Sequence, residues 1–250
     1  MMHLGAFYQS VNPGGVLTNI NAVPDQAIFT SGHDLRVPTD VPNIIWEAAL
    51  TAAAGPVLGQ IQSPSLRELA NRDIEPIEPA AVFSNLAKLQ YHGDSPIALM
   101  PYESMNFAIL ATGGVASECY GLVALADGPV KPVSGNIFTV RASAAAALTL
   151  GAWVNAPVTF ESTLPAGVYQ VVGFRASSTN LVAARLVFIG QAYRPGVTGC
   201  VSSAVTGMLN HRYGALGVFG QFDVNQPPTV DFLGVTDVAQ EVVFDLIKVK

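Results

Sequence analysis

The sequence predicts an all-β fold made of two similar units in tandem, and two patterns lead to this prediction. Short apolar runs are separated by Gly, Pro, Asn and Asp, which is typical of antiparallel strands rather than of alternating strands and helices. The second half also repeats the first at an offset of 123–125 residues. The aligned residues are Ala27 with Ala152, Phe107 with Phe232, and Val115 with Val238. Two copies of half the chain length exclude solenoids and propellers, whose repeats are about 20–50 residues long.

The repeat is clearest at the end of each half. Val115–Glu118 aligns with Val238–Glu241, and an apolar run follows each segment, which predicts two equivalent closing strands. A second match sets Thr39–Ile44 beside Thr163–Val168. Between the halves, Asp127–Pro132 concentrates residues that break regular structure. We therefore expect a first domain over residues 1–130 and a second over residues 131–250.

The apolar runs predict strands in both halves, with turn signals such as Gln226-Pro227-Pro228 between them. In the first half the predicted strands are Ile44–Leu50, Val57–Gln62, Ile97–Met100, Phe107–Ala111 and Tyr120–Ala126. In the second half they are Ile137–Arg141, Val158–Glu161, Val168–Arg175, Leu181–Ile189, Val218–Val224 and Val242–Val249. Five strands are too few for a barrel, so Met1–Arg36 is expected to supply others, with Gln9–Ile20 and Gln26–Thr30 as the candidates. If these are not strands, the first half is an incomplete barrel or a different β-sandwich.

Two segments are predicted to be short helices. Ser63–Asn71 begins with a capping Ser and has Pro64 in its first turn, while Leu66 and Leu69 fall on one face. Ser202–Leu209 is the second candidate. Each segment follows a pair of predicted strands, so the helical insertions also respect the repeat.

The composition predicts a subunit of a larger assembly. Only 12% of the 250 residues are charged, about half the usual share, and the mean hydropathy is +0.39. The longest apolar candidate, Ala142–Val158, is interrupted by polar residues and Gly, whereas a spanning helix needs about 20 apolar residues. A chain with so few surface charges is expected to bury much of its surface against other chains.

The charge of the chain argues against nucleic-acid binding. The net charge is −6, and the first basic side chain is Arg36, so no Lys/Arg-rich N-terminal arm is present. A protein that neutralises many phosphates needs such a patch. Met1–Gly5 does not begin a secretory signal, and we expect synthesis in a reducing cytoplasm. Cys119 and Cys200 are accordingly expected to be buried thiols.

No constellation of residues predicts an active site, so we expect no catalytic residue, cofactor or metal ligand. The four His are not spaced as metal ligands, and nucleophile, P-loop and dinucleotide motifs are absent. Two acidic pairs have the residue types of glycoside chemistry, namely Glu75 with Glu78 and Glu47 with Glu103. They are more simply loop carboxylates. The protein is therefore predicted not to be an enzyme.

Four charged residues occupy matching places in the repeat and are candidates for contacts between subunits. Glu118 and Glu241 each begin a predicted closing strand, where the alternative role is a polar strand end facing solvent. Arg67 and Arg194 each follow a predicted strand pair, at an offset of 127. Trp46 and Trp153 are expected to be core residues, because large aromatic side chains dominate burial in small sandwiches.

Two tandem all-β units of this size resemble the double jelly-roll major capsid proteins of adenovirus-type viruses and of tailless, membrane-containing icosahedral phages. The resemblance covers the whole chain and is carried by the two strand sets, the closing strands Val115–Leu125 and Val238–Val249, and the two helical insertions. It implies two eight-stranded jelly-roll barrels. It also implies homotrimers with a pseudo-hexagonal outline that contact one another in an icosahedral shell. The implied location is the virion.

The resemblance implies further partners, namely penton and minor capsid proteins and an internal membrane. With no direct nucleic-acid binding expected, a membrane, a basic minor protein or packaged cations would separate this subunit from the genome. Two other classes compete with the capsid interpretation. A sugar- or receptor-binding β-sandwich, such as a lectin-like or viral spike protein, usually displays aromatic and Asp/Asn-rich loops. A bicupin enzyme needs clustered His and carboxylate ligands on the strands of a barrel, whereas the four His of this sequence are scattered.

Overall fold

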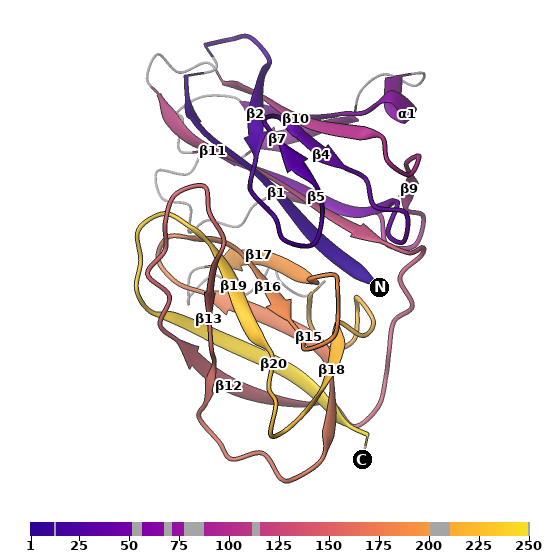
Figure 1. Cartoon of the computed structure of the whole chain (residues 1–250), viewed down its shortest axis with the longest axis vertical. Helices are drawn as coiled ribbons and strands as arrows, with labels where there is room; N and C mark the ends of the chain where they lie inside the picture. Colours follow the sequence, from indigo (N-terminus) through magenta and orange to yellow (C-terminus); the bar gives the residue numbers. More distant parts are fainter. Residues whose placement is uncertain are drawn as a thin grey trace. The chain divides into compact units, whose positions relative to one another are not determined.

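The computed structural model describes residues 1–12, 14–51, 57–67, 72–77, 88–111, 116–200 and 211–249, and it is an all-β protein (Figure 1). Contacts divide the chain between Pro129 and Val130 into two compact units. The first unit comprises residues 3–129, and the second comprises residues 130–250 together with Met1 and Met2. Each unit is one curled sheet, with eleven strands in the first and nine in the second among the described residues.

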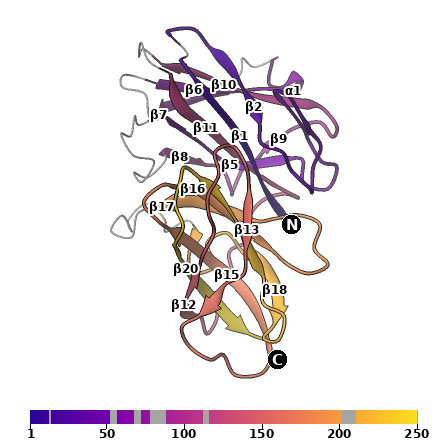
Figure 2. The same ribbon diagram turned by 60° about the vertical axis from the view of Figure 1, so that its left-hand side comes forward.

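The first unit consists of strands and one short helix. Its elements are β1 (Met2–Val11), β2 (Thr18–Ala22), β3 (Thr30–Ser31), β4 (Asp34–Arg36), β5 (Asn43–Thr51), β6 (Val57–Gln62), α1 (Pro64–Arg67), β7 (Arg72–Ile77), β8 (Lys88–Tyr91), β9 (Ile97–Ala98), β10 (Ser104–Ala111) and β11 (Ser117–Ala126). The sheet forms two rows, β1-β11-β5-β8 and β2-β10-β6-β7, joined where β1 pairs with β2 (Figure 2). The rings of Phe7 on β1 and Phe107 on β10 lie 5.5 Å apart, so the two rows enclose the core.

The second unit has the same two rows. Its strands are β12 (Phe138–Ala144), β13 (Val154–Ala156), β14 (Thr159–Phe160), β15 (Val168–Ser177), β16 (Leu181–Val187), β17 (Gly196–Cys200), β18 (Gly220–Asp223), β19 (Thr229–Gly234) and β20 (Gln240–Lys248). One row is β12-β20-β15-β18 and the other is β13-β19-β16-β17, joined where β17 runs parallel to β15. Its core contains a chain of phenylalanine rings. The ring centroid of the buried Phe244 lies 5.5 Å from those of Phe160 and Phe174, and the Phe222 ring lies 6.2 Å from Phe160.

From β5 onward the offset of the repeat holds for five of the six equivalent strand pairs, and the exception is β8 with β18, which begin 132 residues apart. The starts of β5, β6, β7, β10 and β11 precede those of β15, β16, β17, β19 and β20 by 123–125 residues. Phe107 lies opposite Ile20 and Ile61 on its two neighbouring strands, and Phe232 likewise lies opposite Val154 and Ala184. Phe107 and Phe232 are therefore equivalent, as the alignment predicts. The segments predicted as closing strands contain β11 and β20, which occupy the same place in their rows.

The offset is wrong for the first two strands of each unit. β1 and β2 begin 136 residues before β12 and β13, so Ala27 follows β2 whereas Ala152 precedes β13. Ala27 and Ala152 are therefore not equivalent. The physical reason is the connection before β5, which contains the additional hairpin of β3 and β4 in the first unit.

All eleven strands predicted from apolar runs overlap an observed strand. Residues 1–36 supply the further strands β1 to β4, but the two candidate ranges are only partly correct. Gln9–Val11 and Thr18–Ile20 belong to β1 and β2, with Asn12 and residues 14–17 connecting them, and in Gln26–Thr30 only Thr30 belongs to a strand. The predicted helix Ser63–Asn71 is present as α1, and the rest of that segment, like Ser202–Leu209, lies outside the described residues. Trp46 is fully buried, but Trp153 is only half-buried. Cys119 and Cys200 are both buried thiols.

Candidate functional site

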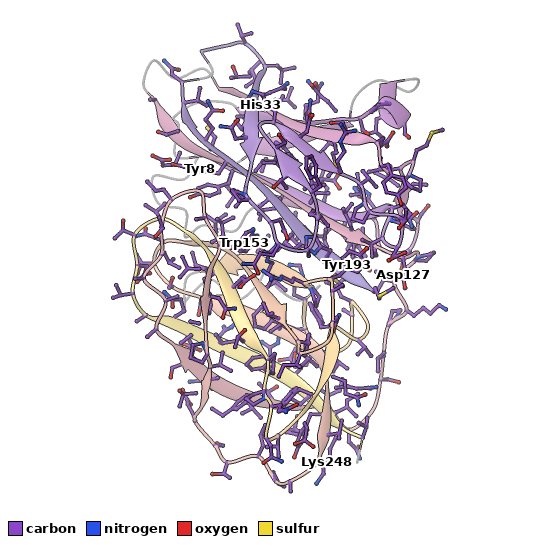
Figure 3. The ribbon with its side chains drawn as sticks, in the orientation of Figure 1. Tyr8, His33, Asp127, Trp153, Tyr193 and Lys248 are labelled. Atoms are coloured by element: carbon purple, nitrogen blue, oxygen red, sulfur yellow. The ribbon has the colours of Figure 1, made fainter. Side chains whose placement is uncertain are left out.

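Glu118 and Glu241 begin the last strand of their units, as predicted, and each contacts a neighbouring strand. The Tyr8 hydroxyl on β1 donates a hydrogen bond to Glu118 (Figure 3 labels Tyr8). Burial, together with this bond, raises the pKa of Tyr8 well above its usual range. Glu241 accepts a hydrogen bond of 2.8 Å from Arg175 Nη2 on β15. Both glutamates therefore fasten the closing strand within their own unit, and Glu241 remains 35% exposed.

Arg67 and Arg194 lie in equivalent connections, between β6 and β7 and between β16 and β17. The Arg67 side chain lies outside the described part of the structure. Arg194 Nη1 lies 2.7 Å from Asp231 Oδ2, and Arg185 Nε lies 2.9 Å from the same oxygen. Arg194 is thus engaged inside the second unit. Within the second unit, Glu241 and Arg194 pair with different partners, and the role of all four candidate residues in contacts between subunits stays a prediction.

Asp231 is the centre of a buried cluster that the sequence analysis missed. Besides the two arginines, Asn155 Nδ2 donates to Asp231 Oδ1 at 2.8 Å. The Arg185 guanidinium lies 4.1 Å from the ring centroid of Trp153, just before β13 (Figure 3). Arg185 is fully buried and Asp231 is 3% exposed. The sequence signal for this cluster was Arg185, a charged residue within the apolar run Leu181–Ile189, because a charge buried in a core strand needs a partner of opposite charge.

Asp245 on β20 is the centre of a second missed cluster. Its carboxylate accepts hydrogen bonds from Arg212 Nε at 2.6 Å, Arg212 Nη2 at 2.8 Å, Thr139 Oγ1 at 2.8 Å and the Tyr213 backbone N–H at 2.9 Å. Burial alone would raise the pKa of Asp245, but these hydrogen bonds outweigh it and hold the pKa below its usual value. The Asp245 carboxylate fits over β15 because residue 173 is Gly: a Cβ on Gly173 would stand 2.2 Å from Asp245 Oδ2.

The Asp245 cluster fixes residues 211–219 against β15 and the start of the second unit. Gly214 donates its N–H to Val172 at 2.7 Å, and its carbonyl accepts the N–H of Val133 at 2.9 Å. Gly214 has φ +80°, and a Cβ there would stand 1.9 Å from the Val133 carbonyl oxygen, so only Gly fits. Tyr213 has φ +56° and is 55% exposed, with the Arg212 guanidinium 4.7 Å from its ring centroid. The segment therefore presents an aromatic ring to solvent.

The first unit has a second exposed tyrosine in the same backbone conformation. Tyr102 has φ +66° and is 72% exposed. Its N–H donates to the Val37 carbonyl at 2.8 Å, and its carbonyl accepts from Arg36 Nη1 at 3.3 Å. Met100 and Phe29 are 68% and 63% exposed. Phe29 is tied to the same region because its carbonyl accepts the Arg36 N–H.

Other charged residues form separate pairs. His3 Nε2 lies 3.2 Å from Asp25, and His92 Nε2 lies 2.8 Å from Glu47. Glu103 instead accepts hydrogen bonds from the backbone N–H and hydroxyl of Ser65 at the start of α1. Glu47 and Glu103 therefore do not act as a pair, and Glu78 lies outside the described residues. Within the described ranges, no three His, Cys, Asp or Glu side chains converge as metal ligands. No helix there is long and apolar enough to cross a bilayer.

Comparison with known proteins does not identify a family. No family model matches the chain, and no curated protein is similar to it at a significant level. Among solved structures, a xanthan lyase from Paenibacillus aligns with 14% identity and a TM-score of 0.25. The alignment covers 100% of this chain and 25% of the lyase chain, so this chain spans a quarter of that protein's length.

Proposed function

We propose that the protein is a double jelly-roll major capsid protein. The observation that carries this proposal is the strand order shared by the two units. If the eight common strands are numbered along the chain, both units place strands 1-8-3-6 in one row and 2-7-4-5 in the other. The placement of the first strand beside the last supports the jelly-roll proposal, because a jelly roll has eight strands in two sheets built from two Greek keys. The remaining strands pair with members of these rows: the hairpin of β3 and β4 with β10, β9 with β5, and β14 with β12.

The distribution of charge supports a role in an assembly. The chain has few charged residues, and several of them are buried in internal pairs, including Arg185, Asp231, Arg212 and Asp245. Large apolar side chains such as Phe29, Met100 and Tyr102 are meanwhile exposed. A surface with few charges and several exposed apolar groups is a surface suited to contacts with other chains.

In the proposed shell, three copies form a trimer whose six barrels give a pseudo-hexagonal outline, and trimers contact one another. Penton and minor capsid proteins would complete the shell, and an internal membrane would lie beneath it. Direct binding to the genome is not part of the proposal, because the chain is acidic. The protein would be made in the host cytoplasm and function in the virion, without enzymatic activity.

Native mass spectrometry and electron microscopy of the purified protein test the proposal. We expect a species of three chains of 26.2 kDa each, and images of six densities around a three-fold axis. A protein that remains monomeric at high concentration in sedimentation experiments would contradict the capsid function. A trimer whose six units are not arranged with approximate six-fold symmetry would contradict the pseudo-hexagonal outline, and with it the capsid function, even though the protein forms an oligomer.

A further inference from the structure

The two units carry net charges of opposite sign. Residues 3–129 contain twelve Asp and Glu and four Lys and Arg, which gives −8. Residues 130–250 contain six Asp and Glu and eight Lys and Arg, which gives +2, and the two values sum to the chain's −6. All of the excess acid therefore belongs to the first unit. Such an asymmetry favours contacts between unlike units over contacts between like ones.

The second unit uses most of its arginines internally and displays other cations. Arg175, Arg185, Arg194 and Arg212 all form ion pairs within the unit. Lys131 and Arg141 are exposed. Lys131 lies beside the segment that Asp245 fixes, because a Cβ on Gly217 would stand 2.8 Å from the Lys131 carbonyl oxygen. Arg141 lies two residues after Thr139 on the same face of β12, and its carbonyl accepts the N–H of the exposed Glu161 at 3.0 Å.

This region also displays apolar groups. Tyr213 is 55% exposed and Val218 is 41% exposed. We call Lys131, Arg141, Tyr213 and Val218 the Tyr213 surface. A tyrosine at positive φ is strained, and the Tyr213 N–H, which donates to the buried Asp245 carboxylate, maintains that conformation. A fixed, exposed tyrosine in the same segment as an exposed Val and next to an exposed Lys has the composition of a protein–protein contact.

We infer that the Tyr213 surface binds the first unit of a second copy of the chain. The inference rests on the proposed function, because a three-fold ring of two-unit chains joins the second unit of each copy to the first unit of the next. Pairing of two Tyr213 surfaces would place cations against cations, whereas a ring requires two different, complementary surfaces. The first unit supplies exposed carboxylates at Asp40 and Asp94. Asp40 lies between Val37 and Pro42, whose carbonyls accept the N–H groups of Tyr102 and Leu99, and Asp94 precedes the exposed Met100 by six residues in the chain. The counterpart, which we call the Tyr102 surface, consists of Asp40, Asp94, Met100 and Tyr102.

Charge substitution with a matched control tests the inference. Lys131→Gln/Arg141→Gln removes two exposed cations and is expected to weaken association of the copies about tenfold, measured by sedimentation velocity in 0.1 M salt. Ile189→Glu/Val238→Glu changes the net charge by the same amount at positions that are 76% and 65% exposed and outside both surfaces. We expect this control to associate like the wild type. Raising the salt to 1 M shortens the Debye length from about 10 Å to about 3 Å and should reduce the difference between the Gln variant and the wild type.

Reversal of both surfaces tests the pairing itself. Lys131→Glu/Arg141→Glu should abolish association, and adding Asp40→Lys/Asp94→Lys to the same chain should restore it. Circular dichroism establishes that each variant is folded. Equal association of the wild type and the Gln variant, equal weakening of the control, or no recovery in the fourfold variant would overturn the inference. A wild type that does not associate would instead overturn the proposed function.

Discussion

The Asp245 cluster offers the sharpest test of how the second unit is held together. Asp245→Asn keeps the shape of the side chain but removes its charge, so Arg212, which is 8% exposed, loses its buried counter-ion. Four hydrogen bonds converge on the carboxylate, and an amide can accept them with only one oxygen. Breaking a buried ion pair by removing one partner costs about 3–5 kcal/mol, and the amide oxygen should recover part of that. We therefore expect a loss of about 2–4 kcal/mol in the free energy of unfolding.

Urea denaturation followed by Trp153 fluorescence in a Trp46→Phe background measures this loss in the second unit. Arg212→Met added to Asp245→Asn removes the unpaired charge, so the double variant should be destabilised by less than the sum of the two single changes. Asp223→Asn is the matched control, because Asp223 is exposed and caps a turn in which Asn can replace it. A cost below about 1 kcal/mol for Asp245→Asn, or strict additivity in the double variant, would refute the reasoning.

Three further predictions concern the core, pH and nucleic acid. Gly121→Ala places a Cβ 2.5 Å from the Phe107 ring and should destabilise the first unit by about 1–3 kcal/mol in urea denaturation, whereas Gly128→Ala, which has open space around it, should be near neutral; equal effects would contradict the packing described for β11. Burial lowers the pKa of His211 to about 3. Between about pH 6.5 and pH 3 the unfolded chain therefore binds one more proton than the folded chain, and the free energy of unfolding should fall by about 1.4 kcal/mol for each pH unit by which the pH is lowered. His211→Gln should remove that slope in denaturation curves measured from pH 7 to pH 4, and an unchanged slope would exclude His211 as its source. A titration with DNA at about 50 mM salt should show no binding at micromolar protein, because the chain is acidic; submicromolar affinity with a steep salt dependence would refute this.

The sequence was sufficient to predict the all-β class and the strands with continuous apolar runs. Val57–Gln62 is β6 itself, and Val168–Arg175 lies within β15. The missed strands have weaker signals for identifiable reasons. β1 contains His3, which is buried beside Asp25 and so interrupts an apolar run without leaving the core. β17 is Gly196–Cys200, whose two glycines carry no side chain to reveal a period, although the whole strand is buried.

The candidate contacts were predictable only as positions in the repeat. Alignment placed Glu118 and Glu241 at equivalent strand starts, but the partner of each depends on a neighbouring strand more than 60 residues away. The Asp231 and Asp245 clusters were missed for the same reason, because pairing of Arg185 with Asp231 requires the register of β16 against β19. Alternation within one strand contains no information on that register.

The register also shows how one strand order accommodates two different charge patterns. Phe107 and Phe232 are equivalent, so the cross-strand pair Arg185 and Asp231 takes the place that Gln62 and Asn106 occupy in the first unit.

The buried carboxylates differ in a similar way. Asp245 lies opposite Gly173, whereas the corresponding strands of the first unit pair Leu122 with Ala48, and the buried acid there is Glu47 on the neighbouring residue of β5. Glu47 contacts His92, just after β8, and Asp245 contacts Arg212, before β18. Because β8 and β18 are the equivalent outer strands of their rows, each unit uses one buried carboxylate to fasten the chain beside that strand. The two anchors are nevertheless not equivalent positions of the repeat, because neighbouring residues of a strand point to opposite faces: Glu47 shares the face of Val123, whereas Asp245 shares the face that corresponds to Leu122 and Ala48.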